Sequence, residues 1–444
     1  MKQIKQITFI LTIVALCGLA LSVQAQMTSV FTVGLQNPTK IITAGHNSLL
    51  VAEAGTTVAN TGRVSLVNRT TGARETLVGG LPSGVNNLGG QPEPSGPSGL
   101  IMHGNTLYLT IGSGDAVMNV GPGLESLNPH PSSPIFDSVL ELNLPGNYEG
   151  ITSQFTLSTA NQTTLAGGGV VALTNANGQQ MTIRMVANLP DSAPNPRPGF
   201  PHNIRASNVF GVEIFQNNLY VVDASFNLIY RVNIGNGQFS TFVTFPNKPN
   251  PLFPSLGGPF VEPVPDNIRI VGHHLLVPLL TGFPFVQNLS EVQIVNLPSG
   301  ERGTFIPNLT SAIDVLRVGG NMYFTLEFSA NQLANQPGRL KFFTSPNAAP
   351  VVVVSNLISP TSMARDETTG NIFVTEIFPG RIIRVQSCKI QNGIVAQSCR
   401  ESKIFCDERF RRSKPVKSGK SVFWKRRFTA FQKFEKRRLK NKPE

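Results

Sequence analysis

Short apolar runs of strand length recur along the chain, and glycine, asparagine or proline bounds each of them. Clear examples are Leu-Tyr-Val-Val at 219–222, Met-Tyr-Phe-Thr at 322–325 and Ile-Phe-Val-Thr at 372–375. β-branched and aromatic residues favour strands, and runs that are apolar throughout are typical of strands buried on both faces. No long apolar stripe at helical spacing interrupts residues 27–386. The pattern therefore predicts an all-β domain.

The strands come as pairs joined by a tight turn, and six such pairs begin near residues 38, 97, 210, 265, 314 and 360. A four-stranded propeller blade with its loops needs roughly 40–50 residues. Most of the spacings fit one blade, but the 113 residues between the second and third entries do not. We interpret that interval as one blade with large insertions, because 116–134 is irregular. This predicts a six-bladed β-propeller of four-stranded blades; two degenerate blades in the interval would give seven.

The last repeat lacks an outer strand, and the N-terminal region supplies a candidate. Residues 29–35 (SVFTVGL) precede an Asn-Pro entry, just as 351–357 (VVVVSNL) precede a Ser-Pro entry. We therefore expect 29–35 to be the outer strand of the last blade. Such closure joins the two ends of the domain and removes open sheet edges.

The N-terminus has the pattern of a secretory signal. Lys2 and Lys5 precede an apolar run at 7–21, and small residues lead to a cleavage site after Ala25. This predicts a signal peptide at 1–25 and a secreted or periplasmic protein. An uncleaved anchor is the alternative, although about 15 apolar residues are short for a membrane span. We divide the remainder into a propeller at 27–386, a cysteine hairpin at 387–403 and a basic tail at 404–444.

Charge is concentrated at the C-terminus. Residues 401–444 hold 16 Lys or Arg and 5 Asp or Glu, so most of the net charge of +12 lies there. The nearly neutral body gives no reason to expect nucleic acid binding. The basic residues, interleaved with Trp424 and several phenylalanines, suit contact with an anionic surface. The alternative is a disordered extension beyond the end of the domain.

Two cysteines flank a predicted turn. Gln-Ser-Cys occurs at 386–388 and again at 397–399, on either side of Asn392-Gly393. An Asn-Gly turn would bring Cys388 and Cys399 together in a hairpin, and an exported protein would join them in a disulfide. Two free thiols are the alternative.

Three segments carry a family resemblance: FTVGLQNPTKIITAGHNSLLVAEAG at 31–55, GRVSLVN at 62–68 and GPSGLIMHGNTLYLTIG at 96–112. Together with the signal pattern, they resemble the ScyD/ScyE-type secreted propellers, and more broadly the NHL-like and gluconolactonase-like six-bladed propellers. The resemblance covers roughly 27–386 and implies the fold and export. It carries over no catalytic residues, and this chain departs from the usual pattern by lacking an acid after the second strand in two blades.

Candidate site residues come from that position. The second strands of four repeats end in an acid, and the same face of a propeller holds the blade entries. The resulting candidates for ligand binding are Glu53, Asp223, Glu327, Glu376, Asn37, Asp266, Asp314 and the loop residue His202, with Asn267 close by. A ring of such oxygens can hold a hard cation such as Ca²⁺, for which Glu53 and Glu376 are the candidate ligands, or poise a general base. The structural alternative is that each acid caps its own turn or pairs with an arginine, Glu53 with Arg63 and Glu376 with Arg381.

Two classes of function remain open. The first is a monomeric binding or scaffold propeller that presents its axial face to a small molecule, a glycan or a protein. The second is an enzyme, either a metal-dependent lactonase or a quinone-dependent sugar dehydrogenase. We favour binding, because an enzyme would carry a denser set of polar residues at the blade entries; fold alone does not decide.

Overall fold

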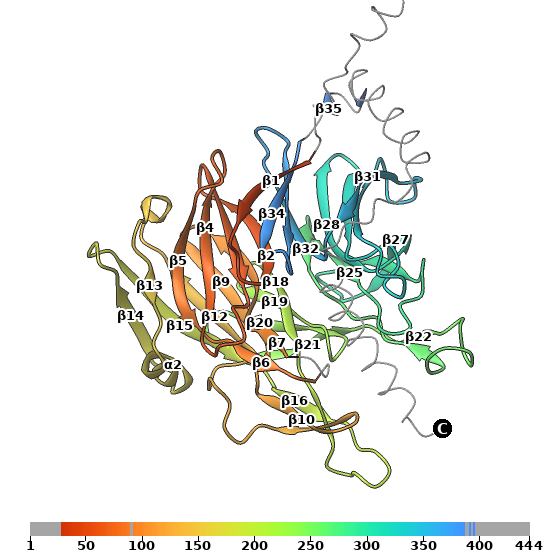
Figure 1. Cartoon of the computed structure of the whole chain (residues 1–444), viewed down its shortest axis with the longest axis horizontal. Coiled ribbons are helices and arrows are strands. Elements are labelled where there is room, and N and C mark those ends of the chain that lie inside the picture. Colours follow the sequence, from red (N-terminus) through yellow and green to blue (C-terminus); the bar gives the residue numbers. More distant parts are fainter. Residues whose placement is uncertain (1–27, 89–91, 387–389, 392–393, 396–444) are drawn as a thin grey trace, which may run out of the picture.

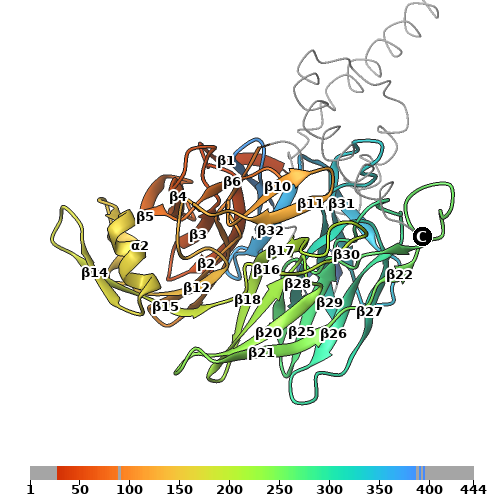
Figure 2. The same ribbon diagram turned by 90° about the horizontal axis from the view of Figure 1, so that it is seen from below.

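The chain folds as a six-bladed β-propeller (Figures 1 and 2). The computed structural model describes residues 28–88, 92–386, 390–391 and 394–395. Six antiparallel sheets surround one axis, and in each sheet the first strand of the repeat is innermost. This confirms the predicted fold class and the count of six, so the seven-bladed alternative is wrong. Within the described part of the chain no helix has the length and apolar character needed to cross a membrane.

Blades 1 and 2 each have five strands. Blade 1 contains β2 (Pro38–Ala44), β3 (Ser48–Glu53), β4 (Gly62–Asn68), β5 (Arg74–Leu81) and β13 (Phe155–Thr156). Blade 2 contains β8 (Pro97–His103), β9 (Thr106–Ile111), β12 (Ser138–Asn143), β15 (Gln180–Asn188) and β14 (Val170–Thr174).

Blades 3 to 6 each have four strands. Blade 3 contains β18 (Val209–Phe215), β19 (Asn218–Asp223), β20 (Leu228–Asn233) and β21 (Phe239–Thr244). Blade 4 contains β24 (Arg269–Val271), β25 (His274–Leu279), β26 (Ser290–Asn296) and β27 (Arg302–Leu309). Blade 5 contains β28 (Ala312–Gly319), β29 (Met322–Glu327), β30 (Gly338–Phe343) and β31 (Val351–Leu357). Blade 6 contains β32 (Pro360–Arg365), β33 (Ile372–Glu376), β34 (Arg381–Val385) and β1 (Thr28–Val33).

The N-terminal strand closes the ring, as predicted. β1 runs antiparallel to β34, with Thr28 opposite Val385 and Val33 opposite Arg381. Farther along, β35 (Ile390–Gln391) pairs with β36 (Ile394–Val395). The predicted signal peptide, the Cys388–Cys399 disulfide and the basic tail lie outside the described residues.

The long interval in the second repeat is one blade with insertions. Between β12 and β15 the chain forms η1 (Tyr148–Gly150), β13, α2 (Thr159–Ala166) and β14. β13 leaves its own blade and pairs in parallel with β5, with Phe155 opposite Val78. The Ser158 side chain caps the first turn of α2 by accepting a hydrogen bond from the Asn161 amide. The insertion therefore covers the outer strands of blades 1 and 2.

Apolar side chains fill the space between neighbouring blades. Second strands such as β3 and β29 are buried along almost their whole length, because each lies between two neighbouring sheets. Between blades 5 and 6, for example, Leu326, Leu340, Met363 and Val374 form part of one buried cluster. This packing explains why these runs alternate so little between apolar and polar residues.

The two faces of the propeller differ in their loops. We call the face at which the first strand of every blade begins the entry face, and the other the opposite face. Four additional hairpins, here called the hairpin layer, project from the entry face along the lower side of Figure 1. They are β6 (Gly84–Asn86) with β7 (Glu93–Ser95), β10 (Val117–Gly121) with β11 (Leu124–Leu127), β16 (Ser192–Pro194) with β17 (Ile204–Ala206), and β22 (Lys248–Pro249) with β23 (Phe260–Val261).

Candidate functional site

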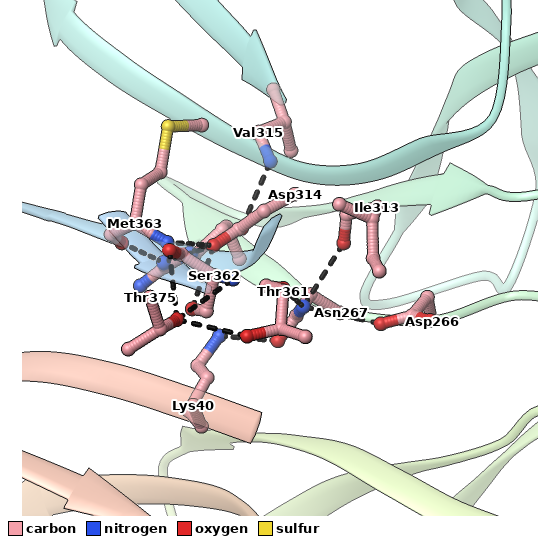
Figure 3. A network of polar contacts seen from close by, with 11 residues as sticks. Lys40, Asp266, Asn267, Ile313, Asp314, Val315, Thr361, Ser362, Met363 and Thr375 are labelled. Carbon is pink, nitrogen blue, oxygen red and sulfur yellow. Dashed lines mark hydrogen bonds and ion pairs between the residues drawn. The ribbon is translucent and has the colours of Figure 1, made fainter. Parts of the chain in front are cut away.

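Side chains from all six blades converge on the axis. The strand registers give each blade an equivalent entry residue, such as Pro38 in blade 1 or Pro97 in blade 2. Counting this entry residue as the first, the third residue of every blade occupies the same place in the first strand. These six aligned residues are Lys40, Gly99, Gly211, Asn267, Asp314 and Ser362. Figure 3 shows four of them, Lys40, Asn267, Asp314 and Ser362, in one network of polar contacts.

Lys40 spans the centre of the ring. Its Nζ donates a hydrogen bond of 2.6 Å to Oδ1 of Asn267, which belongs to blade 4, three blades away. The Asn267 side-chain amide in turn donates to the carbonyls of Ile313 and Thr361, at 3.0 and 3.1 Å, and to Oδ1 of Asp266. One asparagine thus links blades 1, 4, 5 and 6 at the axis (Figure 3).

Two glycines let the strands on the other side of the axis approach closely. A Cβ atom on Gly99 would lie 2.3 Å from the Phe210 carbonyl oxygen, and one on Gly211 would lie 2.7 Å from the Asp266 carbonyl oxygen. Both distances are too short for any side chain. At this level the side chains of Lys40 and Asn267 meet across the axis, and Gly99 and Gly211 let the first strands of blades 2, 3 and 4 pack closely side by side.

Asp314 forms the strongest ion pair of the axis. Arg269 donates two hydrogen bonds to its carboxylate, Nε to Oδ1 at 3.0 Å and Nη2 to Oδ2 at 2.7 Å. The Ser362 hydroxyl and the Met363 amide also donate to Oδ2, each at 3.0 Å. Burial acts to raise the pKa of Asp314, but the charges of Arg269 and Lys40 hold that pKa below its usual value. Asp314 is therefore an ionised partner of Arg269.

Two other axial acids behave in the opposite way. Burial, followed by the neighbouring Asp314 charge, raises the pKa of Asp266 well above its ordinary value. Burial also raises the pKa of Glu213, against the opposing charges of Arg269 and Lys40. For Lys40 itself, burial and the Arg269 charge lower the pKa from 10.5 to about 8. The axis therefore holds the Arg269–Asp314 ion pair, and burial disfavours the charged forms of the neighbouring Asp266, Glu213 and Lys40.

The four predicted acids at the ends of second strands lie elsewhere. Each is fully or almost fully buried at its own blade entry, and no two of them share a hydrogen-bond partner. Three accept a hydrogen bond from the backbone amide two residues before the entry: Glu53 from Gln36, Glu327 from Thr310 and Glu376 from Ile358. Asp223 accepts from the Ser207 hydroxyl and from the amides of Asn208, Ser225 and Phe226.

Three of these acids, Glu53, Glu327 and Glu376, also form ion pairs within their blades. Arg63 pairs with Glu53, and Arg381 pairs with Glu376, at 2.7 and 2.6 Å, as the structural alternative expects. Arg339 and Lys341 both pair with Glu327, at 2.6 Å each. In this arrangement the acids connect the end of the second strand to the entry of their own blade. No three His, Cys, Asp or Glu side chains of the described residues are placed to hold a metal ion together.

The other predicted residues divide into two groups. Asp266 and Asp314 do lie together at the axis. Asn37 has a positive φ of 52° just before its blade entry, and its side-chain amide donates to the Gly55 carbonyl at 2.8 Å. His202 is exposed in the hairpin between β16 and β17, in the hairpin layer.

Three charged residues of the axis were missed from the sequence: Lys40, Arg269 and Glu213. Their signal was a charged residue inside the first strand of a repeat: Lys40 stands in the same column as Asn267 and Asp314, and Glu213 and Arg269 share a column that is otherwise apolar. Lys40, in Pro-Thr-Lys-Ile-Ile, is only 1 % exposed although it is flanked by apolar strand residues. Comparing the six repeats column by column would have found it.

A further buried acid lies at the junction of blades 2 and 3. Asp137 is fully buried, and neither of its carboxylate oxygens makes a hydrogen bond within normal geometry, although the Ser207 hydroxyl and the Val209 amide lie nearby. Burial, then the charges of Asp223 and Asp191, raise its pKa well above the ordinary value. In blade 3 the equivalent residue is Asn227, whose side chain accepts from the Val264 amide at 3.0 Å.

Exposed apolar side chains distinguish the entry face from the opposite face. Among the described residues, eight large apolar side chains are exposed in entry-face loops and none in opposite-face loops. The eight are Val58, Val120, Leu127, Phe200, Leu252, Phe253, Phe260 and Phe378. Six of them belong to the hairpin layer. All five tyrosines of the chain are buried, so the exposed aromatic residues of the described part are phenylalanines.

The hairpin layer is internally braced. Arg205 pairs with Glu262 through two hydrogen bonds, at 2.9 and 3.1 Å, and so joins β17 to the chain after β23. Glu125 accepts from the Ala206 amide, while its own amide donates to Asn203. At the tip of the β16–β17 hairpin, Arg197 and Phe200 exchange two backbone hydrogen bonds around a Pro-Gly turn. These contacts hold the exposed apolar side chains on ordered backbone.

The comparisons with known proteins give distant structural matches. No protein-family model and no curated protein matches the chain. A structural genomics protein of unknown function from Bacteroides thetaiotaomicron is 12% identical, with 81% of this chain and 75% of that chain covered and a TM-score of 0.45. An auxiliary nutrient binding protein from the same organism is 9% identical, with 79% and 69% covered and a TM-score of 0.44. The WD40 β-propeller domain of Doa1 is 12% identical, with 81% and 97% covered and a TM-score of 0.40. The chain is a six-bladed β-propeller by its own sheet order; these scores and identities carry no argument about function.

Proposed function

We propose that this chain is an exported binding propeller of the ScyD/ScyE type, and that it binds a partner protein through the hairpin layer of its entry face. The observation that carries the proposal is the distribution of exposed apolar side chains of the described residues, with eight in the loops and hairpins of the entry face and none in the loops of the opposite face. Exposed apolar patches are typical of protein-binding sites, and we infer that side chains of this face contribute to one.

The composition of the face favours a protein over a glycan. Phenylalanine and leucine side chains on braced hairpins suit insertion into apolar pockets, and rigid anchors lose little conformational entropy on binding. The described surface lacks exposed tyrosine, whose amphipathic ring suits sugars and wet interfaces. The hydrogen bond between Lys40 and Asn267 crosses the axis. This favours a surface site over a small molecule held in an axial channel.

Chain geometry also leaves this face accessible. β1 begins and β34 ends at the opposite face, where Thr28 lies beside Val385. The predicted signal peptide and basic tail are therefore attached on the side away from the hairpin layer. Within the described residues, the entry face presents the hairpin layer and the loops that join second to third strands.

The test compares three versions of the full chain: wild type, a variant with Phe200→Ser, Phe253→Ser and Phe260→Ser, and a control with Val170→Ser and Phe239→Ser on outer strands. Partners are cross-linked from the extracellular fraction of the source cells, and the affinity of the purified partner is then measured by calorimetry. We expect the triple variant to lose about tenfold or more in affinity and the control to bind normally. All the changed residues are exposed, so each version should fold.

Two results would contradict the proposal. One is a partner or glycan that binds the triple variant as tightly as it binds wild type. The other is a lactonase or quinone-dependent dehydrogenase activity that is lost in a folded Glu53→Gln, Glu376→Gln variant, since this would favour the enzyme interpretation.

A further inference from the structure

A cleft lies between the outer strands of blades 5 and 6. Its volume is about 150 Å³, and all the residues of its lining belong to β1, β31, β33 and β34. Val354, Leu357 and Ile383 supply an apolar wall, and Glu376 and Arg381 supply an ion pair. The lining includes no residue of the hairpin layer, so the cleft is separate from the surface of the proposed function.

Arg381 is less fully paired than the equivalent arginines of blades 1 and 5. Each of the three lies opposite the acid that ends the second strand of its blade, and donates to that acid through Nε. In blade 1, Nη2 of Arg63 also donates to the Gly34 carbonyl at 2.8 Å. In blade 5, Nη2 of Arg339 lies 2.6 Å from the Glu327 carboxylate. Among the described residues Arg381 donates only through Nε, and 27% of its side chain is exposed, so Nη1 and Nη2 are available to a ligand.

The repeat shows how this junction differs from that of blade 1. Gly34, whose carbonyl Arg63 reaches, lies four residues before the blade entry Pro38. The residue four before the entry Pro360 is Asn356, which is exposed and lines the cleft. The side chain of Arg381 makes no corresponding bond to Asn356, and both residues line the cleft instead.

A second donor in the lining also lacks a partner. The hydroxyl of Ser29 is buried and makes no hydrogen bond to another described residue. A buried polar group without a partner costs free energy, so an acceptor atom of a ligand that reaches this hydroxyl stabilises the complex. The cleft thus combines unused donors on Arg381 and Ser29 with an apolar wall.

We propose that this cleft binds a small carboxylate that carries a short aliphatic chain. An edge of a guanidinium matches the two oxygens of a carboxylate in geometry and charge, and Glu376 does not use the Nη1–Nη2 edge of Arg381. The aliphatic chain would lie against Val354, Leu357 and Ile383. The volume limits the ligand to a few carbon atoms, and the like charge of Glu376 limits its affinity.

Butyrate is the probe, and saturation-transfer NMR of its methyl group measures binding to the full chain. We expect a Kd of about 1 mM for wild type. Arg381→Lys keeps the positive charge beside Glu376 but loses the planar pair of donors, so it should raise the Kd about tenfold or more. The matched control is Arg63→Lys, which makes the same change at the equivalent position of blade 1 and should bind butyrate like wild type.

A second pair of variants tests the cleft without changing a charge. Val30 lines the cleft and is 53% exposed, so Val30→Trp should fill its mouth and abolish binding. Val33→Trp, at an exposed residue of the same strand outside the lining, should bind normally. The proposal is overturned if wild type does not bind butyrate at about 10 mM, or if the uncharged butyramide binds as tightly. It is also overturned if Arg381→Lys or Val30→Trp keeps wild-type affinity, or if either control loses binding equally. A circular dichroism melt confirms that each variant is folded.

Discussion

Nζ of Lys40 donates a hydrogen bond of 2.6 Å to Oδ1 of Asn267, although the two residues are 227 positions apart in the sequence. Blades 1 and 4 stand opposite each other in a ring of six, so this bond crosses the axis. The bond belongs to one buried network that also contains the Arg269–Asp314 ion pair and the carbonyls of Thr361 and Ile313. The centre of the propeller is therefore held by specific polar contacts, and its acids differ in protonation.

The two axial aspartates should respond oppositely to substitution by asparagine. Asp314→Asn leaves the buried guanidinium of Arg269 without a carboxylate, and we expect it to reduce the free energy of unfolding by about 3–5 kcal/mol at pH 7. Asp266→Asn should change it by less than about 1 kcal/mol or increase it, because the pKa of Asp266 is raised and asparagine keeps the oxygen that accepts from Asn267. Urea denaturation measures both; equal losses would mean that Asp266 is ionised in the native state.

Lys40 should make stability depend on alkaline pH. Its pKa is lowered to about 8 in the native state from 10.5, by burial first and then by Arg269. Below pH 8 both states hold the proton, so the slope is zero. Between about pH 8 and 10.5 the unfolded chain binds more protons, so the free energy of unfolding should rise with pH, by about 3 kcal/mol in total.

The measurement for Lys40 is the difference between wild type and Lys40→Met across this window. Titrating groups away from Lys40, such as Lys341, contribute equally to both and cancel. The difference should increase from pH 8 upwards and level off near 10.5. A flat difference would show that Lys40 keeps its ordinary pKa in the folded protein.

Asp137→Asn should stabilise the protein at neutral pH. Burial and the charges of Asp223 and Asp191 raise the pKa of Asp137, so the native state retains a proton that the unfolded chain has released. This penalty is absent below about pH 4 and grows as pH rises. We expect a gain of at least about 1 kcal/mol at pH 7, measured by urea denaturation, that disappears towards pH 4.

The matched control for Asp137 is its neighbour Asp223→Asn. The carboxylate of Asp223 accepts from three backbone amides and from Ser207, and an asparagine NH₂ cannot accept these bonds. This variant should lose stability. If Asp137→Asn is destabilising at pH 7 as well, the Asp137 carboxylate is better satisfied than its geometry indicates.

Local patterns in the sequence were enough to predict the six blades, their entry residues and closure by β1. Each blade is a meander of neighbouring strands, so its apolar runs and turns lie within about 50 residues of one another. An insertion in blade 2 was predicted, but at 116–134, where the chain forms the β10–β11 hairpin; the larger insertion, with β13, α2 and β14, lies between β12 and β15. The pairing of β13 with blade 1 was not predicted, because a parallel partner outside its own repeat has no signature in the local sequence.

The candidate acids show what the sequence pattern could not predict, namely which of them lie at the axis. Glu53 and Asp314 are both acids at repeated positions, and both were placed around one axial site. In the structure Glu53 is paired with Arg63 at its own blade entry, whereas Asp314 meets Arg269 at the axis. The strand order decides this, because Glu53 ends a second strand whereas Asp314 lies in an innermost first strand, beside the axis.

The sequence by itself determined the fold, because a repeated local pattern of strands and turns specifies a propeller. Only the tertiary structure decided which charged groups meet at the axis and which face carries the exposed apolar side chains. Lys40, Asn267 and Asp314 come together only when the ring closes, and their protonation follows from burial and from charges that are distant in sequence. The apolar side chains of the hairpin layer likewise share one face only because the loops that carry them all connect strands at the same end of the blades.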